Sequence, residues 1–198
     1  TTDVTRTIAV LPDQVTDEMR ERFTRVLKGH LNVALTGFPA GTDGTSLDEA
    51  ARAALQEVGL NFAHGTGHGV GSYLSVHEGP QGISPRARTP LQPGMIVSNE
   101  PGYYEAGAYG IRIENLILVT ETGKKDAHGQ DLYGFKNLTL APIDRNLIDV
   151  SLLTVEELQF LNAYHAETYE TIAPLLAEID PACAAWLKEV TAPLTYQG

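Results

Sequence analysis

The sequence predicts an α+β fold in which helices and a sheet of returning strands share a hydrophobic core. Three stretches, at about 15–35, 46–58 and 154–176, repeat apolar residues at helical spacing. Between them lie short apolar runs, rich in β-branched residues and bounded by turn signals, which are typical of strands. No internal repeat or composition shift divides the chain, so we expect one domain over 1–198.

Composition excludes several classes of protein. With 198 residues, 42% hydrophobic and 20% charged, the chain is typical of a globular protein. No apolar run approaches the roughly 20 residues needed to cross a bilayer, so we expect no membrane-spanning segment. A net charge of -11 argues against nucleic acid as a partner, because it opposes attraction to phosphates. The single cysteine, Cys183, allows no internal disulfide and fits a reducing compartment.

Residues 2–11 are predicted to form a half-buried strand. β-branched residues dominate this stretch, and its period of two places Asp3, Thr5 and Thr7 on one face. The strand pattern begins at once at Thr1, without an initiator methionine, so we expect the chain to be a piece of a longer protein.

Two helices are predicted next. The first spans about 15–35, and its apolar stripe consists of Met19, Phe23, Val26, Leu27, Leu31 and Ala34. Ser46 to Glu49 has the form of a capping box, so the second helix is expected to begin at Ser46 and to end at Gly59. Its inward positions are Leu47, Ala50, Ala51, Ala54, Leu55 and Val58.

Two later strands are expected to bring carboxylates together. Residues 95–100 form an apolar run that ends on Glu100, and 111–119 reads as the returning strand. In the second strand Arg112 and Glu114 share a face. Because paired strands lie about 4.8 Å apart, Glu100 and Glu114 can converge.

The rest of the chain is predicted as loops, one strand and two helices. The polar stretches 81–89 and 123–134 are expected to be loops, and 135–142 a last strand. Thr154 to Glu157 forms a second capping box that opens a long helix. Residues 181–190 form a short final helix, in which we expect Trp186 to lie in the core.

The stretch from His64 to Pro80 holds three histidines and five glycines, a composition that favours neither a helix nor an ordinary strand. Glycine there indicates that something approaches the backbone closely, and histidine can bind a metal or move a proton near neutral pH. A histidine taken alone is more often structural. We expect His30, His128 and His165 to have such structural roles, as solvated or capping residues.

Four residues on or beside different predicted strands form a candidate metal cluster: Asp3, His68, Glu100 and Glu114. Carboxylates about 4 Å apart repel by roughly 4 kcal/mol per pair at an effective dielectric near 20, so such a cluster needs a cation. Carboxylate oxygens with one imidazole suit Mn, Co, Fe or Zn. Two such metals could activate a water for attack on a carbonyl, which is hydrolase chemistry.

The same stretches resemble the Xaa-Pro aminopeptidase (aminopeptidase P) family of pita-bread metallopeptidases. The similar segments are 2–7, 64–80, 99–104 and 110–115. The tail from Phe135 to Thr154 is similar to the C-terminal end of the long, three-domain members. The resemblance implies a pita-bread fold that is incomplete at its N-terminal side. Residues 1–198 would be the C-terminal portion of the catalytic domain, including a C-terminal extension from about 135 to 198.

The resemblance also implies a metal site. Asp3 and Glu114 would bridge two metal ions, and His68 and Glu100 would complete one of them. We expect Mn²⁺, with Co²⁺ or Zn²⁺ as alternatives. The family's remaining ligand is an aspartate on a strand before Asp3, so the second metal site is expected to be incomplete in this chain.

The remaining site roles are likewise implied by the resemblance. His64 and His77 would contact the substrate, together with His68 and Glu100. Glu100 would also relay a proton to the leaving proline nitrogen, because an imide nitrogen must be protonated to leave. Arg112 would support the metal ligands through a second layer of contacts. The Tyr103–Tyr104 pair either lines a substrate pocket or only packs.

The implied activity is release of the N-terminal residue from peptides with proline in second position, through a hydroxide held between the metals. We expect the 198-residue chain alone to be inactive, and the intact protein to be an active cytoplasmic homodimer. Three alternatives remain: prolidase, which shares the metal centre; creatinase, which uses the fold without metals; and a domain without catalysis that binds peptides or histones. Four of the family's ligand positions and both histidines implied to contact the substrate are retained, which argues against the last two: Asp3, His64, His68, His77, Glu100 and Glu114.

Overall fold

A computed structural model describes residues 2–73 and 75–196, which separate into two compact units. Unit 1 holds the residues up to Thr5 and Val26–Thr139, and unit 2 holds Arg6–Arg25 and the residues from Leu140 onward. Helix α1 (Asp17–Leu35) contributes residues to both. None of the helices in the described part of the chain has the length and apolar character needed to cross a bilayer.

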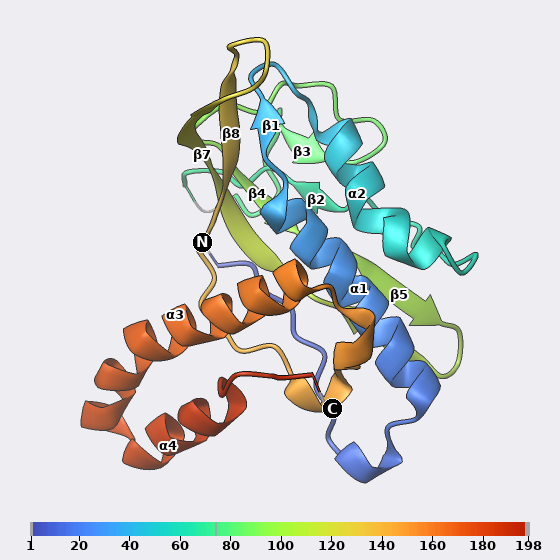
Figure 1. The fold of residues 1–198 in the computed structure, drawn as a ribbon, viewed down its shortest axis with the longest axis vertical. Helices are drawn as coiled ribbons and strands as arrows, with labels where there is room; N and C mark the ends of the chain where they lie inside the picture. Colours follow the sequence, from blue (N-terminus) through green and yellow to red (C-terminus); the bar gives the residue numbers. More distant parts are fainter. Residues whose placement is uncertain (1, 74, 197–198) are drawn as a thin grey trace. The chain divides into compact units, whose positions relative to one another are not determined.

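Unit 1 is built on a four-stranded antiparallel sheet in the order β1-β8-β7-β4, with helix α2 (Gly44–Gln56) beside it (Figure 1). The strands of this sheet are β1 (Phe38–Pro39), β4 (Ile96–Asn99), β7 (Asn115–Lys125) and β8 (Asp131–Asn137). Two smaller pairs complete the unit: β2 (Gly67–His68) with β3 (Gly82–Ile83), and β5 (Gly102–Glu105) with β6 (Tyr109–Arg112). The sequence prediction of an α+β fold is therefore confirmed.

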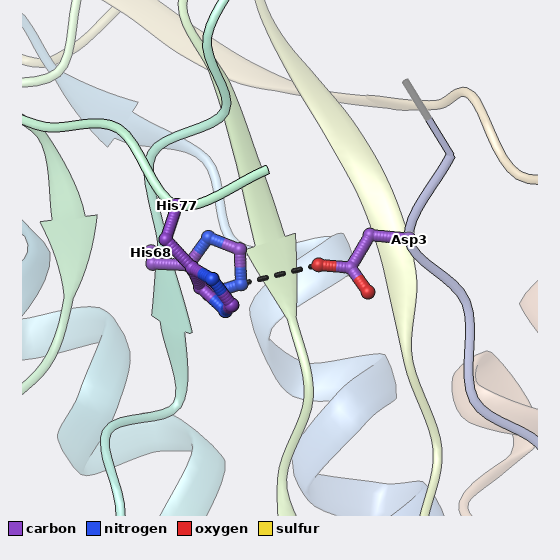
Figure 2. Close-up of side chains that lie close together, drawn as sticks. All are labelled: Asp3, His68 and His77. Carbon is purple, nitrogen blue, oxygen red and sulfur yellow. Dashed lines mark ion pairs between the residues drawn. The ribbon is translucent and has the colours of Figure 1, made fainter. Parts of the chain in front are cut away.

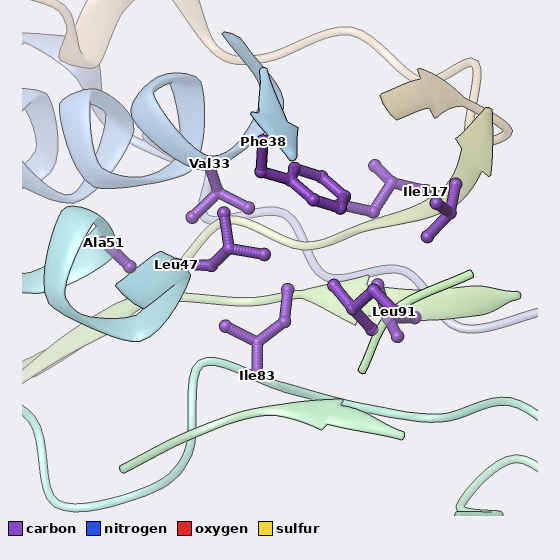
Figure 3. Packing of buried hydrophobic residues seen from close by; sticks show 9 residues of the cluster. Val33, Phe38, Leu47, Ala51, Ile83, Leu91 and Ile117 are labelled. Atoms are coloured by element: carbon purple, nitrogen blue, oxygen red, sulfur yellow. The ribbon is translucent and has the colours of Figure 1, made fainter. Parts of the chain in front are cut away.

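The core of unit 1 lies between its helices and the sheet. Side chains from α1, α2, β1, β3 and β7 point toward one another there (Figure 3). The cluster comprises Val33, Phe38, Leu47, Ala51, Ile83, Leu91, Val97, Ile117 and Val119. These residues are at most 2% exposed, so burial of this apolar surface is the main force that holds the helices to the sheet.

Strand β4 separates the core from the polar side of the sheet. Val97 belongs to the core cluster, and Asn99 donates a hydrogen bond from Nδ2 to the carbonyl of His30 on α1 (2.9 Å). Because side chains alternate along a strand, Ser98 and Glu100 face the other way. Ser98 and Glu100 therefore lie on, and directly after, a strand whose opposite face is anchored in the core.

The prediction of a strand over 2–11 is wrong. Within this stretch only Thr5 makes a β-bridge, with Glu114. From Arg6 the chain belongs to unit 2, where the guanidinium donates to the carbonyls of Ala141 and Pro142 and so directs the chain away from a ladder. Of the three residues predicted to share a face, Asp3 and Thr5 both reach the acidic cluster described below, whereas Thr7 belongs to unit 2.

Helix α2 begins two residues before the predicted Ser46, because Asp43 rather than Ser46 caps it and accepts a hydrogen bond from Thr45 N at 2.9 Å. Val58, predicted to face inward, is 40% exposed because the helix has ended at Gln56. Gly59 does close the helix, with φ of 74°.

The predicted strand over 111–119 is interrupted. Residues up to Arg112 belong to the β5–β6 pair, whereas β7 begins at Asn115 and pairs with β4. The predicted loop over 123–134 instead holds the ends of β7 and β8, which continue beyond the core as an exposed ribbon. Polar residues in such a ribbon give no hydrophobic signal, which explains the error. β3 was missed for a different reason: it is only two residues long, too short to show a strand period, although Ile83 is buried in the core.

Unit 2 contains the C-terminal helices α3 (Val155–Ile179) and α4 (Pro181–Val190), and the 3-10 turns Pro12–Gln14, Arg145–Leu147 and Val150–Leu152. The predicted capping box at Thr154 is confirmed: Thr154 Oγ1 accepts from Glu157 N, and Glu157 Oε2 accepts from Thr154 N. Trp186, predicted in the core, is 51% exposed, because α4 buries only Leu187 among its described residues.

Two histidines predicted to be solvated or capping are buried instead: His30 is 2% exposed and His165 has no exposed surface. His165 Nε2 accepts a hydrogen bond from Ile143 N at 3.1 Å, and its buried Nδ1 has no partner among the described residues. Burial, with help from Arg145 and Arg6, lowers the pKa of His165 from 6.5 to about 4.

This shift predicts a loss of stability in mild acid. In the unfolded chain His165 gains a proton below about pH 6.5, but the folded chain resists protonation down to about pH 4. The folded state is therefore penalised as the pH falls through this window, by up to about 3 kcal/mol. His165→Gln keeps an acceptor for Ile143 N without the titration, so urea unfolding between pH 7 and 4 should show a shallower decline for this variant.

The control for this prediction is His128→Gln, which removes an exposed histidine and should lose stability in acid as steeply as the wild type. A decline in His165→Gln as steep as that of the wild type would contradict the assignment.

Candidate metal centre

Four segments of unit 1 bring the predicted ligands together. His68 lies on β2, Glu100 directly follows β4, and Glu114 directly precedes β7. Register places Asn99 opposite Asn115, so the neighbouring Glu100 and Glu114 are brought side by side, as predicted. Asp3 approaches through the bridge between Thr5 and Glu114. Ligand atoms of His68, Glu100 and Glu114 lie within 4.8 Å of one another, and so do those of Asp3, His68 and His77.

His68 is held in place by its own backbone. Its N–H donates to Ser98 Oγ at 2.9 Å. The preceding Gly67 packs against the backbone of β4 so closely that an added Cβ would lie 1.9 Å from Ser98 O. Here the glycine is required, since any side chain would push β2 away from β4. This close approach is what the glycines around the histidines indicated.

The His68 ring presents a lone pair to two carboxylates. Nδ1 lies 3.0 Å from the Gly69 carbonyl and, because a carbonyl only accepts, Nδ1 carries the hydrogen. Nε2 then points toward Asp3 Oδ2 at 3.2 Å and Glu100 Oε1 at 3.3 Å (Figure 2 shows the first contact). Yet Nε2 is buried and makes no hydrogen bond within the described part of the chain. A lone pair facing carboxylate oxygens is repelled unless a positive charge, either a proton or a metal ion, lies between them.

The two glutamates are also fixed and desolvated. Ser98 Oγ donates to Glu100 Oε1 at 3.0 Å, and Thr5 Oγ1 donates to Glu114 Oε2. Glu114 is only 3% exposed. Burial raises the pKa of Glu100 and also that of Glu114, whose pKa is raised further by the charges of Glu100 and Asp3. Both shifts express the cost of holding negative charge here without a counterion.

Charge and donor type together fit a divalent metal ion. Asp3, Glu100 and Glu114 bring three negative charges, and the adjacent Arg112 brings one positive charge at 3.9 Å from Glu100 Oε2, which leaves two uncompensated. Carboxylate oxygens and a neutral imidazole are ligands that first-row divalent ions accept. The orphaned Nε2 and this charge balance mean that the residues present suit such an ion.

His77 lies against the same cluster. Its ring centroid is 4.1 Å from that of His68, and its side chain is exposed (Figure 2). The family resemblance implied substrate contact for His77. The structure places it within ligand distance of Asp3 and His68, on the open side of the cluster.

His64 and Arg112 are linked through a residue whose role the sequence left open. Tyr104 OH accepts a hydrogen bond from Arg112 Nε at 3.0 Å and lies 2.8 Å from His64 Nε2. Because His64 Nδ1 donates to Gly65 O, Nε2 is free to accept the Tyr104 hydrogen. Tyr104 therefore belongs to the site, whereas Tyr103 is 6% exposed and packs.

His64 stands at the edge of a cavity of about 710 Å³ whose lining includes Arg52, Phe62, His64 and Arg86. Burial lowers the pKa of His64 below 6.5, and the charges of Arg112 and Arg52 lower it further. The imidazole is therefore neutral at pH 7. Sequence reasoning left Tyr104 open between lining a pocket and packing, and it did not single out Thr5 or Ser98 as site residues. Of these two, only Thr5 had a usable signal, its predicted shared face with Asp3.

Comparison with known proteins identifies the family. Residues 1–121 match the metallopeptidase family M24, and residues 131–194 match the C-terminal region of peptidase M24. The chain belongs to metallopeptidase family M24. Its fold is accordingly the pita-bread fold, of which the chain covers a part, as the solved M24 structures below also indicate.

Relatives in this M24 family carry related names. The chain is 50% identical over 198 residues to a probable Xaa-Pro aminopeptidase P of Laccaria bicolor, covering 98% of this chain and 30% of the relative. It also resembles the solved X-prolyl aminopeptidase of Caenorhabditis elegans, described as a cytosolic enzyme with a di-nuclear active site (TM-score 0.90, 42% identity, 98% of this chain and 31% of that one). A Xaa-Pro dipeptidase from Bacillus anthracis matches less completely (TM-score 0.59, 36% identity, 72% and 36%). The chain thus spans about a third of its relatives' length.

The hydrogen bond to Glu114 predicts a measurable contribution to metal binding. Thr5→Val keeps the side-chain shape but removes the hydroxyl donor. Glu114 then loses the hydrogen bond that orients its carboxylate. Loss of such outer contacts typically costs about 10- to 100-fold in metal affinity. Calorimetric titration with Mn²⁺ should show this weakening. The matched control Thr42→Val removes a hydroxyl bonded to Pro39 O, outside the cluster, and should bind like wild type. Equal affinities for all three proteins would exclude the role of Thr5.

Proposed function

We propose that the protein containing these residues is a metal-dependent aminopeptidase that releases the N-terminal residue from peptides with proline in second position. The observation that carries the proposal is the buried His68 Nε2, which faces the carboxylates of Asp3 and Glu100 and lacks a hydrogen-bond partner among the described residues. Membership in family M24 and the aminopeptidase names of the relatives support it.

In this proposal Asp3, His68, Glu100 and Glu114 would hold the metal ions, and Asp3 and Glu114 would serve both of them. When bound, the ions would supply Lewis acidity, lowering the pKa of water toward neutrality and polarising the scissile carbonyl. We favour Mn²⁺, with Co²⁺ or Zn²⁺ as alternatives. The di-nuclear active site described for the C. elegans relative supports two ions. A further ligand for the second ion would have to come from outside the four described here.

The chain's own residues would then orient the peptide and move protons. Neutral His64 would exchange the Tyr104 hydrogen bond at its Nε2 for one to the substrate, while Nδ1 stays bonded to Gly65 O. The exposed His77, next to His68, would offer a second imidazole. Glu100, held by Ser98 on one oxygen and near Arg112 on the other, would carry a proton to the proline nitrogen.

The domain assignment, oligomeric state, location and partners are proposed from the family match and the composition. We assign residues 1–198 to the catalytic domain, with a C-terminal extension from about 135, consistent with the separate match over 131–194. A homodimer is proposed from the family resemblance alone. A cytoplasmic location is supported by the cytosolic relative and by the single cysteine. The net charge of -11 makes nucleic acid an unsuitable partner.

A dipeptidase that cleaves Xaa-Pro is the second candidate, favoured by the 36% identity to the B. anthracis enzyme. The broader coverage by the aminopeptidase, 98% of the chain against 72%, supports the first candidate instead. The two differ in whether a residue follows the proline.

Peptide cleavage with added Mn²⁺ decides between them. The protein that contains these residues should hydrolyse Ala-Pro-Ala and leave Ala-Pro and Ala-Ala-Ala nearly untouched. His68→Ala should lower the rate by at least about 100-fold, because it removes the imidazole from the metal set. The control His128→Ala changes an exposed histidine in the turn between β7 and β8 and should keep full activity. Preference for Ala-Pro would establish the dipeptidase, and cleavage unaffected by chelation would overturn both.

A further inference from the structure

Helix α2 carries a buried ion pair that the proposed chemistry does not use. Asp48 and Arg52 lie one turn apart and are 2% and 7% exposed. Arg52 Nε donates to Asp48 Oδ2 at 2.8 Å, and Nη2 donates to Oδ1 at 3.0 Å. Desolvating two charges costs free energy that their attraction alone often fails to recover, so a buried pair of this kind calls for a further role.

The rest of the guanidinium binds the segment that leads into the site. Nη1 donates to Asn61 Oδ1 at 2.8 Å and to the carbonyl of Phe62 at 2.7 Å, and Nη2 donates to the carbonyl of His64 at 2.7 Å. Arg52 also stacks over the Phe62 ring, with Cζ 4.0 Å from its centroid. All five N–H groups of Arg52 are therefore occupied, three of them by residues 61–64.

The carboxylate extends the same hold toward the metal cluster. Asp48 Oδ1 accepts a hydrogen bond from Thr66 Oγ1 at 2.8 Å, and Thr66 has no exposed surface. The Thr66 carbonyl in turn accepts from Glu100 N at 2.7 Å. The ion pair therefore fixes the chain on both sides of Gly65. On one side Arg52 holds the carbonyl of His64, and on the other Asp48 holds Thr66, whose carbonyl is bonded to Glu100 N.

We propose that Arg52, held in orientation by Asp48, is the positioning residue for the His64 imidazole. The ring depends on the backbone that Arg52 fixes: it packs on Phe62 at 4.9 Å between centroids and meets Tyr104 OH at 2.8 Å. The effect on catalysis rests on the proposed function, because it assumes that His64 contacts the substrate. The effect on the ring itself does not.

Arg52→Lys is the sharpest variant, because it keeps the charge but offers three donors from a single atom instead of five in a planar fork. Lysine can stay near Asp48 but cannot also hold the carbonyls of Phe62 and His64. We expect kcat on Ala-Pro-Ala to fall by about 10- to 100-fold, with a smaller change in KM, since a small displacement of a catalytic group costs this much.

A double-mutant cycle separates positioning from general destabilisation. In a His64→Gln background, Arg52→Lys should lower kcat by less than about twofold further, since the group it positions is already gone. An equal loss in both backgrounds, or an Arg52→Lys enzyme within twofold of wild type, would overturn the proposal. Arg25→Lys is the matched control. It alters another arginine paired four residues back, with Glu21 at 2.8 Å, and should leave kcat unchanged.

A second readout needs no activity. The ¹³C–¹H signal of the His64 ring, identified by its loss in His64→Gln, should shift or split in Arg52→Lys while the exposed His128 signal stays in place. An unchanged His64 signal would overturn the positioning role. A moved signal in a protein that cleaves no Xaa-Pro peptide would refute the proposed function and leave the positioning role intact. Thermal unfolding of each variant confirms that folded protein is compared.

Discussion

The acidic cluster around His68 is the constraint on which unit 1 depends. Three carboxylates brought within reach of one another repel by roughly 4 kcal/mol per pair at 4 Å, a large share of the total stability of a domain. The sheet withstands this repulsion because the opposite face of β4 is packed in the core through Val97. Its register with β7, which sets Asn99 opposite Asn115, leaves Glu100 and Glu114 no alternative position. A one-residue slip would turn those side chains toward the core.

Close backbone contact is the second requirement, and it explains the composition of the histidine and glycine stretch. His68 reaches the carboxylates only because β2 approaches β4 without a side chain between them. A Cβ on Gly67 would lie 1.9 Å from Ser98 O, and one on Gly69 would lie 2.2 Å from Glu78 O. The glycines and the histidines therefore serve one purpose: the glycines remove bulk so that the imidazoles can converge.

Sequence reasoning succeeded where a feature is local or chemically distinctive. The helices followed from apolar periodicity, the Thr154 capping box from its spacing, and the approach of Glu100 to Glu114 from the predicted strands. It failed where the partner is distant in sequence. The exposed β7–β8 ribbon carries no apolar pattern, and nothing near His165 in the sequence reveals that Ile143 N supplies its hydrogen bond. The role of Tyr104 stayed open at the sequence level, because it depends on contacts with Arg112 and with His64, which is 40 residues away.

The Asp48–Arg52 pair and the cluster around His68 differ in whether their hydrogen-bonding groups are satisfied, and this difference distinguishes a structural role from a ligand-binding one. In the Asp48–Arg52 pair every guanidinium hydrogen has an acceptor, so the group is complete as it stands and its effect is to fix residues 61–66. The cluster around His68 is incomplete: Nε2 has no hydrogen-bond partner among the described residues, and the carboxylates outnumber the adjacent cation. A protein retains such a deficit only where something else completes it, since an unpaired buried charge is otherwise costly. The Asp48–Arg52 pair, which is satisfied, therefore stabilises the backbone of residues 61–66, and the cluster around His68, which is not, is the site expected to bind a ligand.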